Sequence, residues 1–389
     1  MIISWRNLFA IILLLTLLLL LTVIPFQLPK GVGEGDFRPY WSSSYLLVHN
    51  GDFGDPDQLG YIERELTGWN ESFTMYAWFF PTGNLIIAPL THLQFSHAVF
   101  IWLTLSTVVI VVSSILLWPY NKKHPWVPIL TTLVFSMTLA SLAVGQINTF
   151  EVLGLALFLF YEKKDKKFTA GLSLIFVSIK AHLVIITLPL LLLDLYRRKQ
   201  LHTLAGFFTS TFICALTLFS MYPKWPASFW KLVSFGMVLT RETPTLNGLL
   251  VISGNYTWGK WIWVLALIIS MLIWFWRGKD MDTRTLIDST IIIGLIVSPV
   301  GWSYDQIMLL LPILRIFEWV YSRSFNKWEA VFVITILIIT DSFTFYQRSL
   351  GFSDVWFFWV PMMVAAVYVY TRNRSKELTY RFETIQSPN

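Results

Sequence analysis

The sequence predicts an all-α polytopic membrane protein with about 12 transmembrane helices. Hydrophobic residues make up 55% of the 389 residues, and charged residues make up only 13%. Soluble globular proteins carry a much larger share of charged residues. Apolar runs also recur along nearly the whole chain. We therefore expect a single integral membrane domain over residues 1–389.

The predicted spans follow from the ~20 apolar residues that a helix needs to cross a bilayer. The first run follows a single Arg6 and has no small-residue cleavage pattern, so we expect a retained helix and not a signal peptide. The stretch 81–94 is expected to be a partial or re-entrant helix that leads into the second span. The runs are 7–27, 95–118, 127–144, 149–161, 168–180, 182–196, 203–221, 260–276, 285–299, 306–321, 328–342 and 355–371.

The basic residues indicate the orientation. With the N-terminus inside, the inner loops and ends hold 20 of the 29 lysines and arginines, in clusters such as 162–167 and 197–199. The positive-inside rule favours this topology. It explains the formal charge of +6 better than a nucleic-acid partner does, because the basic residues do not form one face. We expect a plasma-membrane protein with both termini, including the tail 372–389, in the cytoplasm.

Two long loops lie outside on this topology, at 28–94 and 222–259. Long loops often carry binding and catalytic residues. The first contains eight acidic residues and amphipathic stretches such as "YWSSSYLLVHNG", which are typical of helices that lie on a membrane surface. Three predicted helical hairpins also end outside in polar tips, "GQIN" at 145–148, "KAH" at 180–182 and "SPVGWSYDQ" at 298–306.

Asp36 heads the first outer loop, in "GEGDFRPYW". A carboxylate at this position can meet a lipid-borne reactant and accept the proton of a sugar hydroxyl. Asp36 is equally a good N-cap, with Pro39 in the first helical turn. The two interpretations are compatible, because an N-cap position holds a carboxylate rigidly. The role of Arg38 stays open: it can contact a phosphate or anchor the chain at the membrane interface.

Polar groups at membrane depth are costly, so the hairpin tips are candidate sites. Lys180 and His182 are typical of a cationic pocket for a phosphate, or of a snorkelling lysine and a helix-capping histidine. Gln146 and Asn148 suit a sugar and a helix-packing contact equally.

The third tip and the second outer loop offer further candidates. Tyr304 and Asp305 follow Pro299 and Gly301, which break the helix, and they leave the same two alternatives open. Arg241 with its neighbour Glu242 can be a simple surface ion pair.

Motifs for soluble nucleotide and hydrolase chemistry are missing from the sequence: HExxH, a P-loop, GxSxG, and GxGxxG after a strand. Acids of the first loop could ligate a divalent cation, but their spacing does not demand one. We predict no metal site and no cofactor.

Six stretches, taken in order over about residues 30–312, resemble glycosyltransferase family 87 of the GT-C class. They are "GDFRPYWSSSYLLVHNGDFGDP", "FFPTGNLIIAPLTHL", "GQINTFEVLGLALFLF", "AGLSLIFVSIKAHLVIITLPLLLL", "TPTLNGLLVISG" and "SPVGWSYDQIMLLLP". Their order and spacing carry the resemblance. The family includes alpha-1,2-mannosyltransferases of bacterial glycolipid synthesis.

The resemblance implies a GT-C-like fold and an inverting transfer at the outer face. A hexose, mannose by family, would move from a polyprenyl-phosphate sugar to a glycolipid or glycan acceptor, with Asp36 as general base. Lys180, with its neighbour His182, and Arg241 would hold the donor phosphate. The expected sugar and acceptor contacts are Arg38, Tyr40, Gln146, Asn148, Tyr304 and Asp305.

The sequence departs from the family pattern at two points. Family members usually have Lys-Pro where this chain has Lys180-Ala181, and a histidine after Ser-Trp where it has Trp302-Ser303-Tyr304-Asp305. Two other classes therefore stay open, a transporter or flippase for a lipid or sugar and a noncatalytic GT-C-like scaffold. Transporters tend to have internal repeats and sites near the midplane. Polar groups at outer hairpin tips and a long acidic loop favour an enzyme.

Overall fold

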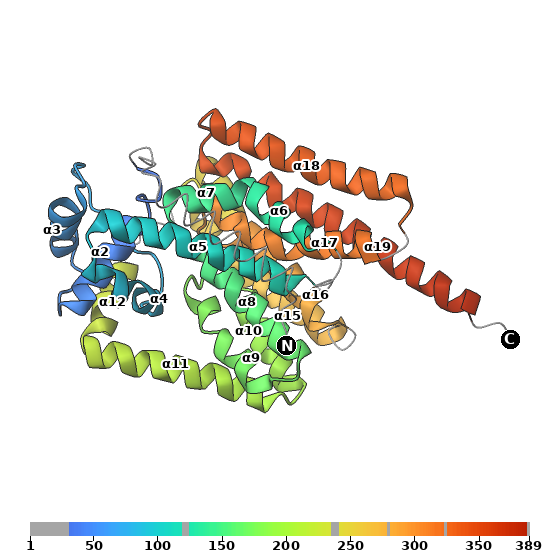
Figure 1. Ribbon diagram of the computed structural model, residues 1–389, viewed down its shortest axis with the longest axis horizontal. Coiled ribbons are helices and arrows are strands. Elements are labelled where there is room, and N and C mark those ends of the chain that lie inside the picture. Colours follow the sequence, from blue (N-terminus) through green and yellow to red (C-terminus); the bar gives the residue numbers. More distant parts are fainter. Residues whose placement is uncertain (1–30, 119–123, 235–240, 278–280, 323–324, 387–389) are drawn as a thin grey trace.

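The computed structural model describes residues 31–118, 124–234, 241–277, 281–322 and 325–386 (Figure 1). Every regular element within these ranges is a helix, and none is a strand. This confirms the predicted all-α class. The predicted first span, 7–27, lies outside the described residues.

The first loop folds into short helices, α2 (Phe37–Val48), α3 (Pro56–Thr67) and α4 (Thr82–Ile87), and a 3-10 helix, η1 (Ala88–His92). The side chain of Asp55 caps α3 by accepting from Asp57 N and Gln58 N. Gly68, in the left-handed conformation, ends α3. The helices α4 and η1 are far too short to cross a bilayer. The stretch 81–94 is thus a partial helix, as predicted.

Among the described residues, five helical stretches are long and apolar enough to cross a membrane, as expected for an integral membrane protein. A sixth forms if two short helices, bent by 60° at Phe135, are counted as one span. The five are α5 (Phe95–Leu117), α11 (Leu201–Met221), Thr257–Trp276, α18 (Lys327–Ser349) and Asp354–Glu377. The bent pair is α6 (Trp126–Val134) and α7 (Ser136–Val144).

The other predicted spans that fall on described residues are helical but too short to cross alone. The total of about twelve spans therefore stays a prediction. They are α8 (Asn148–Lys163), α9 (Lys167–Ser173), η2 (Phe176–Ser178), α10 (Thr187–Arg197), α16 (Thr283–Val297), η5 (Ser303–Leu309) and α17 (Leu310–Ser322). The remaining elements are α12 (Trp225–Ser234), α13 (Leu246–Ile252), α14 (Tyr256–Gly259), α15 (Ile262–Arg277), η6 (Asp354–Phe357) and α19 (Trp359–Gln386).

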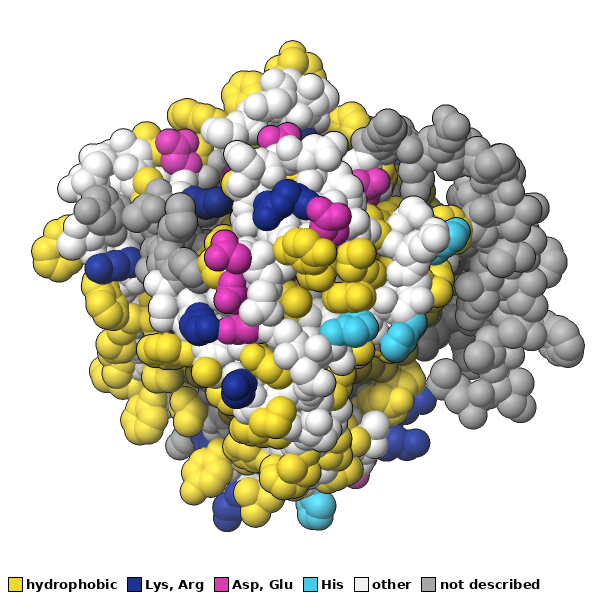
Figure 2. All heavy atoms as spheres, turned by 90° about the vertical axis from the view of Figure 1, so that its left-hand side faces the viewer, with side chains coloured by type: hydrophobic (Ala, Val, Ile, Leu, Met, Phe, Trp, Pro, Cys, Tyr) yellow, Lys and Arg dark blue, Asp and Glu magenta, His cyan; other side chains and the backbone are white. Residues whose placement is uncertain are grey.

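Two hydrophobic clusters make up most of the core. One unites the apolar helices, from α5 and α8 to α17 and α19. The other joins the first loop to α5 and α8, with Phe37 stacked on Trp102 and Trp102 on Phe150. Figure 1 shows α2, α3, α4 and α12 together at one end of the molecule, and α19 reaching away at the other. In Figure 2, acidic and basic side chains lie across the middle of that end, and hydrophobic side chains gather toward its lower edge.

Candidate active site

Asp36 is fixed where the first loop meets the end of α7. Its backbone N–H donates to Val144 O at 2.7 Å, and Gly33 N donates to Ala143 O at 2.6 Å. Asp36 occupies the N-cap position of α2, as predicted, but its side chain makes no capping hydrogen bond. The carboxylate is directed instead toward Gln146, which donates to it through Nε2.

Gly145 makes this junction feasible. It ends α7 with φ +75°, a conformation that favours glycine. A Cβ atom at this position would lie 2.3 Å from Gly33 O. A side chain at position 145 would therefore push the loop that carries Asp36 away from α7.

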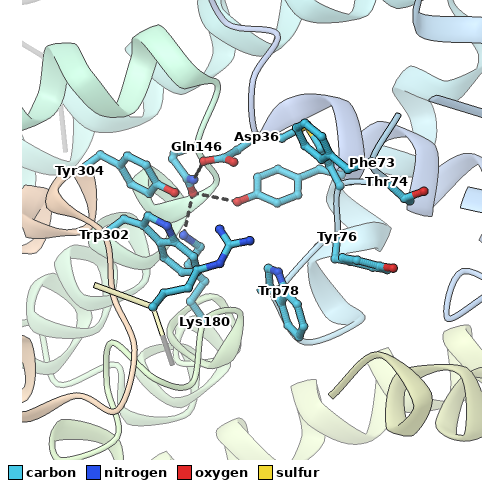
Figure 3. Close-up of a pocket in the computed structure, with 12 residues that line it drawn as sticks. Asp36, Phe73, Thr74, Tyr76, Trp78, Gln146, Lys180, Trp302 and Tyr304 are labelled. Atoms are coloured by element: carbon cyan, nitrogen blue, oxygen red, sulfur yellow. Dashed lines mark hydrogen bonds between the residues drawn. The ribbon is translucent and has the colours of Figure 1, made fainter. Parts of the chain in front are cut away.

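Gln146 links the proposed base to a buried lysine (Figure 3). Its Oε1 accepts from Lys180 Nζ at 2.7 Å and from the Tyr40 hydroxyl at 2.9 Å. Its Nε2 donates to Asp36. These three bonds fix the orientation of the amide, because only the oxygen can accept from Lys180 and Tyr40. Gln146 thus binds Asp36 through the nitrogen and Lys180 through the oxygen of one amide group.

Lys180 is 2% exposed and forms an ion pair with the fully buried Asp305, with 2.9 Å between Nζ and Oδ1. The Lys180 backbone N–H donates to Glu151 Oε1 at 2.6 Å, which fixes the tip between η2 and α10. Asp305 also accepts from Trp302 N at 2.9 Å. Burial alone would raise the pKa of Asp305, but the charge of Lys180 and the neighbouring His182 outweigh burial and hold the pKa below its ordinary value.

Burial raises the pKa of Asp36 above its ordinary value. The Lys180 charge and hydrogen bonds from Tyr304 and Gln146 act in the opposite direction. A carboxylate with a raised pKa is a stronger base than a solvated aspartate. The arrangement therefore favours proton transfer to Asp36.

One pocket of about 120 Å³ opens among these residues. It contains six of the ten site residues predicted from the sequence. They are Asp36, Tyr40, Gln146, Lys180, Arg241 and Tyr304. Arg241 is exposed and reaches the pocket from the second long loop. The expected base, Asp36, thus shares one cavity with Lys180 and Arg241, two of the three residues expected to bind the phosphate.

Three predicted residues, Asp305 and its neighbours Asn148 and His182, lie behind the pocket and do not line it. Asn148 Nδ2 donates to Asp305 Oδ1 and to Tyr304 O, both at 3.3 Å, so it joins α8 to η5. His182 Nε2 lies 3.7 Å from Asp305 Oδ2, and its ring packs edge-on against Trp302. These positions suit support of Lys180 better than direct contact with a substrate.

Arg38 does not line the pocket. Its guanidinium is buried, donates to the carbonyl and hydroxyl oxygens of Thr67 and to Glu34, and lies 5.0 Å from the centre of the Phe95 ring. It also lies 5.1 Å from the Trp69 ring. Neither a phosphate contact nor a membrane-interface anchor describes this environment.

The sequence interpretation missed an aromatic side of the pocket. Six residues form it: five come from one segment without regular structure between α3 and α4, and the sixth comes from the third hairpin tip. They are Phe73, Thr74, Met75, Tyr76, Trp78 and Trp302. The run "FTMYAWFF" at 73–80 was the available signal, because it gathers aromatic residues in an outer loop, but none of its residues was predicted to line the site. Trp302 stacks parallel to Tyr304, with 6.1 Å between the ring centres.

The sequence profile of glycosyltransferase family 87 matches residues 79–299, more than half of the chain. The chain belongs to this family. The protein is therefore a glycosyltransferase. The match covers Gln146, Lys180 and Arg241, whereas Asp36 precedes it and Tyr304 follows it. No curated protein and no solved structure matches the chain.

A metal ion in a protein is held by several ligands that lie close together. Within the described ranges, no group of three or more His, Cys, Asp or Glu side chains lies close enough together to hold one. The charged groups that line the pocket are Asp36, Lys180 and Arg241. Two cations and one acid suit a reaction that expels an anion and removes one proton.

Proposed function

We propose that this protein is an inverting membrane glycosyltransferase that moves a hexose, mannose in the first instance, from a polyprenyl-phosphate sugar to a glycolipid or glycan acceptor. The site faces the outer side of the membrane. Glycosyl transfer itself follows from the family; the donor, the sugar, the stereochemistry and the location are our proposal. The observation that carries it is that Asp36 and Lys180 share one pocket and are joined through Gln146.

The proposed reaction is a single displacement. Asp36 accepts the proton of an acceptor hydroxyl while that oxygen attacks the anomeric carbon of the donor. The bond from the anomeric carbon to the phosphate oxygen breaks, and the polyprenyl phosphate leaves with the bonding electron pair. Attack from the face opposite the leaving group inverts the anomeric configuration.

Lys180 and Arg241 are the groups we assign to the departing phosphate. Lys180 is anchored by Asp305 and Gln146, so its charge is in place before the reaction. Such preorganised charge is most effective where water is partly excluded. The side chains of Trp302 and Tyr304 add to this exclusion, with ring centres 5.9 and 5.5 Å from Lys180 Nζ. The proposed reaction uses no metal or other cofactor.

A panel of donors tests the proposed chemistry. The purified protein is incubated with octyl α-mannoside and, in separate reactions, with polyprenyl-phosphate mannose, polyprenyl-phosphate glucose and GDP-mannose. We expect transfer from the polyprenyl-phosphate mannose, with the opposite anomeric configuration in the product by NMR. Transfer from GDP-mannose alone, or retention of configuration, would refute the proposed donor or mechanism.

The same donors separate the enzyme from a transporter or flippase. In sealed vesicles, a flippase moves the labelled lipid between leaflets and forms no glycosidic bond. A noncatalytic scaffold does neither. The family assignment favours the enzyme.

A further inference from the structure

A buried acid, Glu63, lies behind one side of the pocket. Its side chain is 0% exposed, and its Oε2 accepts from Met75 N at 3.0 Å. Met75 belongs to the segment 73–78, which supplies five residues to the pocket and which we call the aromatic wall. A buried carboxyl group is costly unless it is hydrogen-bonded. The hydrogen bond from Met75 N therefore stabilises the buried Glu63 carboxyl group and ties it to the aromatic wall.

Arg38 ties the same region to the helix of the proposed base. It lies in the first turn of α2, two residues after Asp36, and donates to both oxygens of Thr67 at the end of α3. The Thr67 hydroxyl in turn donates to Glu63 O. A continuous network thus runs from α2 through α3 to the backbone of Met75.

The aromatic wall is held at two further points. Gly60 of α3 packs so closely on Thr74 that a Cβ atom at position 60 would lie 2.5 Å from the Thr74 hydroxyl oxygen. Beyond the wall, Phe80 N donates to Ile179 O at 2.7 Å, directly before Lys180. The segment is therefore fixed to α3 on one side and to the Lys180 tip on the other.

We propose that Glu63 and Arg38 are positioning residues that hold the aromatic wall as the acceptor side of the pocket. This inference rests on the proposed function. Neither residue touches the reacting atoms; both act through the wall and through α2.

The placement of the acceptor follows from Figure 3. Phe73, Thr74, Tyr76 and Trp78 lie on one side of Asp36, and Lys180, Trp302 and Tyr304 lie on the other. The leaving phosphate belongs beside Lys180. The base must contact the acceptor hydroxyl, so the acceptor lies between Asp36 and the wall. Aromatic faces there can pack against the apolar C–H face of a sugar ring.

Hydrogen exchange of peptides that cover 73–78 tests the positioning role without any substrate. Glu63→Leu removes the acceptor of the Met75 N–H, whereas Glu63→Gln keeps an acceptor of nearly the same shape. We expect amide exchange in the wall to rise about tenfold or more in the leucine variant and to stay within about twofold in the glutamine variant. The exposed Glu65, replaced by leucine, is the control for loss of a neighbouring acid.

Thr67→Val is a milder variant that keeps the proposal testable if Glu63→Leu fails to fold. It removes the hydroxyl that joins Arg38 to Glu63 O, and we expect exchange in the wall to rise about threefold. Unchanged exchange in Thr67→Val and in a folded Glu63→Leu would overturn the positioning role.

Kinetics with octyl α-mannoside test the acceptor assignment. We expect Glu63→Leu to raise the KM for this acceptor about tenfold, to leave the KM for the polyprenyl-phosphate donor within about twofold, and to recover in Glu63→Gln. Increased exchange with an unchanged acceptor KM would overturn the acceptor assignment. An inactive wild type would count against the proposed function, and the exchange result would still decide the positioning role.

Discussion

At the scale of single residues, the site depends on how Gln146 is bonded. Its amide oxygen faces Lys180 and Tyr40, and its amide nitrogen faces Asp36. A sugar contact, one of the two alternatives from the sequence, would have to replace one of these bonds. Gln146 therefore acts mainly on the neighbouring Asp36 and Lys180.

Gln146→Glu tests this role through the pH dependence of transfer. A second acid beside Asp36 disfavours its ionised form and raises its pKa further. Loss of activity toward low pH should therefore begin about one pH unit higher than in the wild type. The pH profile of kcat/KM measures the shift, and Gln58→Glu, at an exposed position on α3, should leave it unchanged. An unshifted acidic limb in Gln146→Glu would contradict the assignment of Asp36 as the base.

Glu63 predicts a pH dependence of stability. Burial raises its pKa from 4.5 to about 7, although Met75 N–H, Arg38 and Arg64 oppose the shift. Between these two values the folded chain binds more protons than the unfolded chain, so the free energy of unfolding falls as pH rises from about 4.5 to 7. Tyr76, which also faces Glu63, stays neutral in this range because the pKa of Tyr76 is raised above 10.

Glu63→Gln isolates this contribution. The variant should lose less stability than the wild type between pH 5 and 8, because it has no group at position 63 to ionise. Thermal unfolding followed by tryptophan fluorescence in detergent gives both pH slopes. Equal slopes in the two proteins would contradict the raised pKa of Glu63.

At the scale of elements, the end of α7 decides where the loop that carries Asp36 lies. Gly145→Ala combines a left-handed backbone with a contact of 2.3 Å to Gly33 O. We expect it to destabilise the protein by about 1–3 kcal/mol and to lower transfer at least tenfold, because the base moves. Gly68→Ala is the matched control, since Gly68 has φ +70° with nothing within 4 Å of the added atom. Equal losses of transfer in both variants would contradict a role for the junction.

The sequence predicted the polar tips that meet at the site, but it did not predict the aromatic wall of the pocket. The polar tips at Gln146, Lys180 and Tyr304 were found because polar residues between apolar runs are conspicuous. The aromatic wall has no helical or strand period, and its aromatics looked like any residues near a membrane interface. Arg38 could not be placed because, apart from Glu34, its partners are distant in the sequence: Thr67 and Phe95 are 29 and 57 residues away.

At the scale of the whole molecule, the number of spans was the weakest prediction. A hydrophobic run in the sequence does not reveal how long its helix is. The run 168–180 forms the short helices α9 and η2, and α10 and α17 begin only after the polar tips 180–182 and 298–306. The all-α class and the helical first loop followed directly from composition and pattern. Orientation rests on the distribution of basic residues alone.

Cysteine labelling tests the orientation. Cys214 is the only cysteine in the chain, so Cys214→Ser provides a cysteine-free background. Glu65→Cys in the first loop should react with a membrane-impermeant maleimide on intact cells. Lys166→Cys, before α9, should react only after the membrane is permeabilised. The reverse pattern would refute the outer location of the pocket.

The assignment of Asp36 as the base is tested most directly by transfer from polyprenyl-phosphate mannose to octyl α-mannoside in Asp36→Asn. Asparagine keeps the shape of the side chain but cannot accept the hydroxyl proton, so kcat should fall about 100-fold or more. Asp57→Asn, an exposed acid of the same loop, should keep wild-type activity. Transfer by Asp36→Asn at the wild-type rate would contradict the central claim.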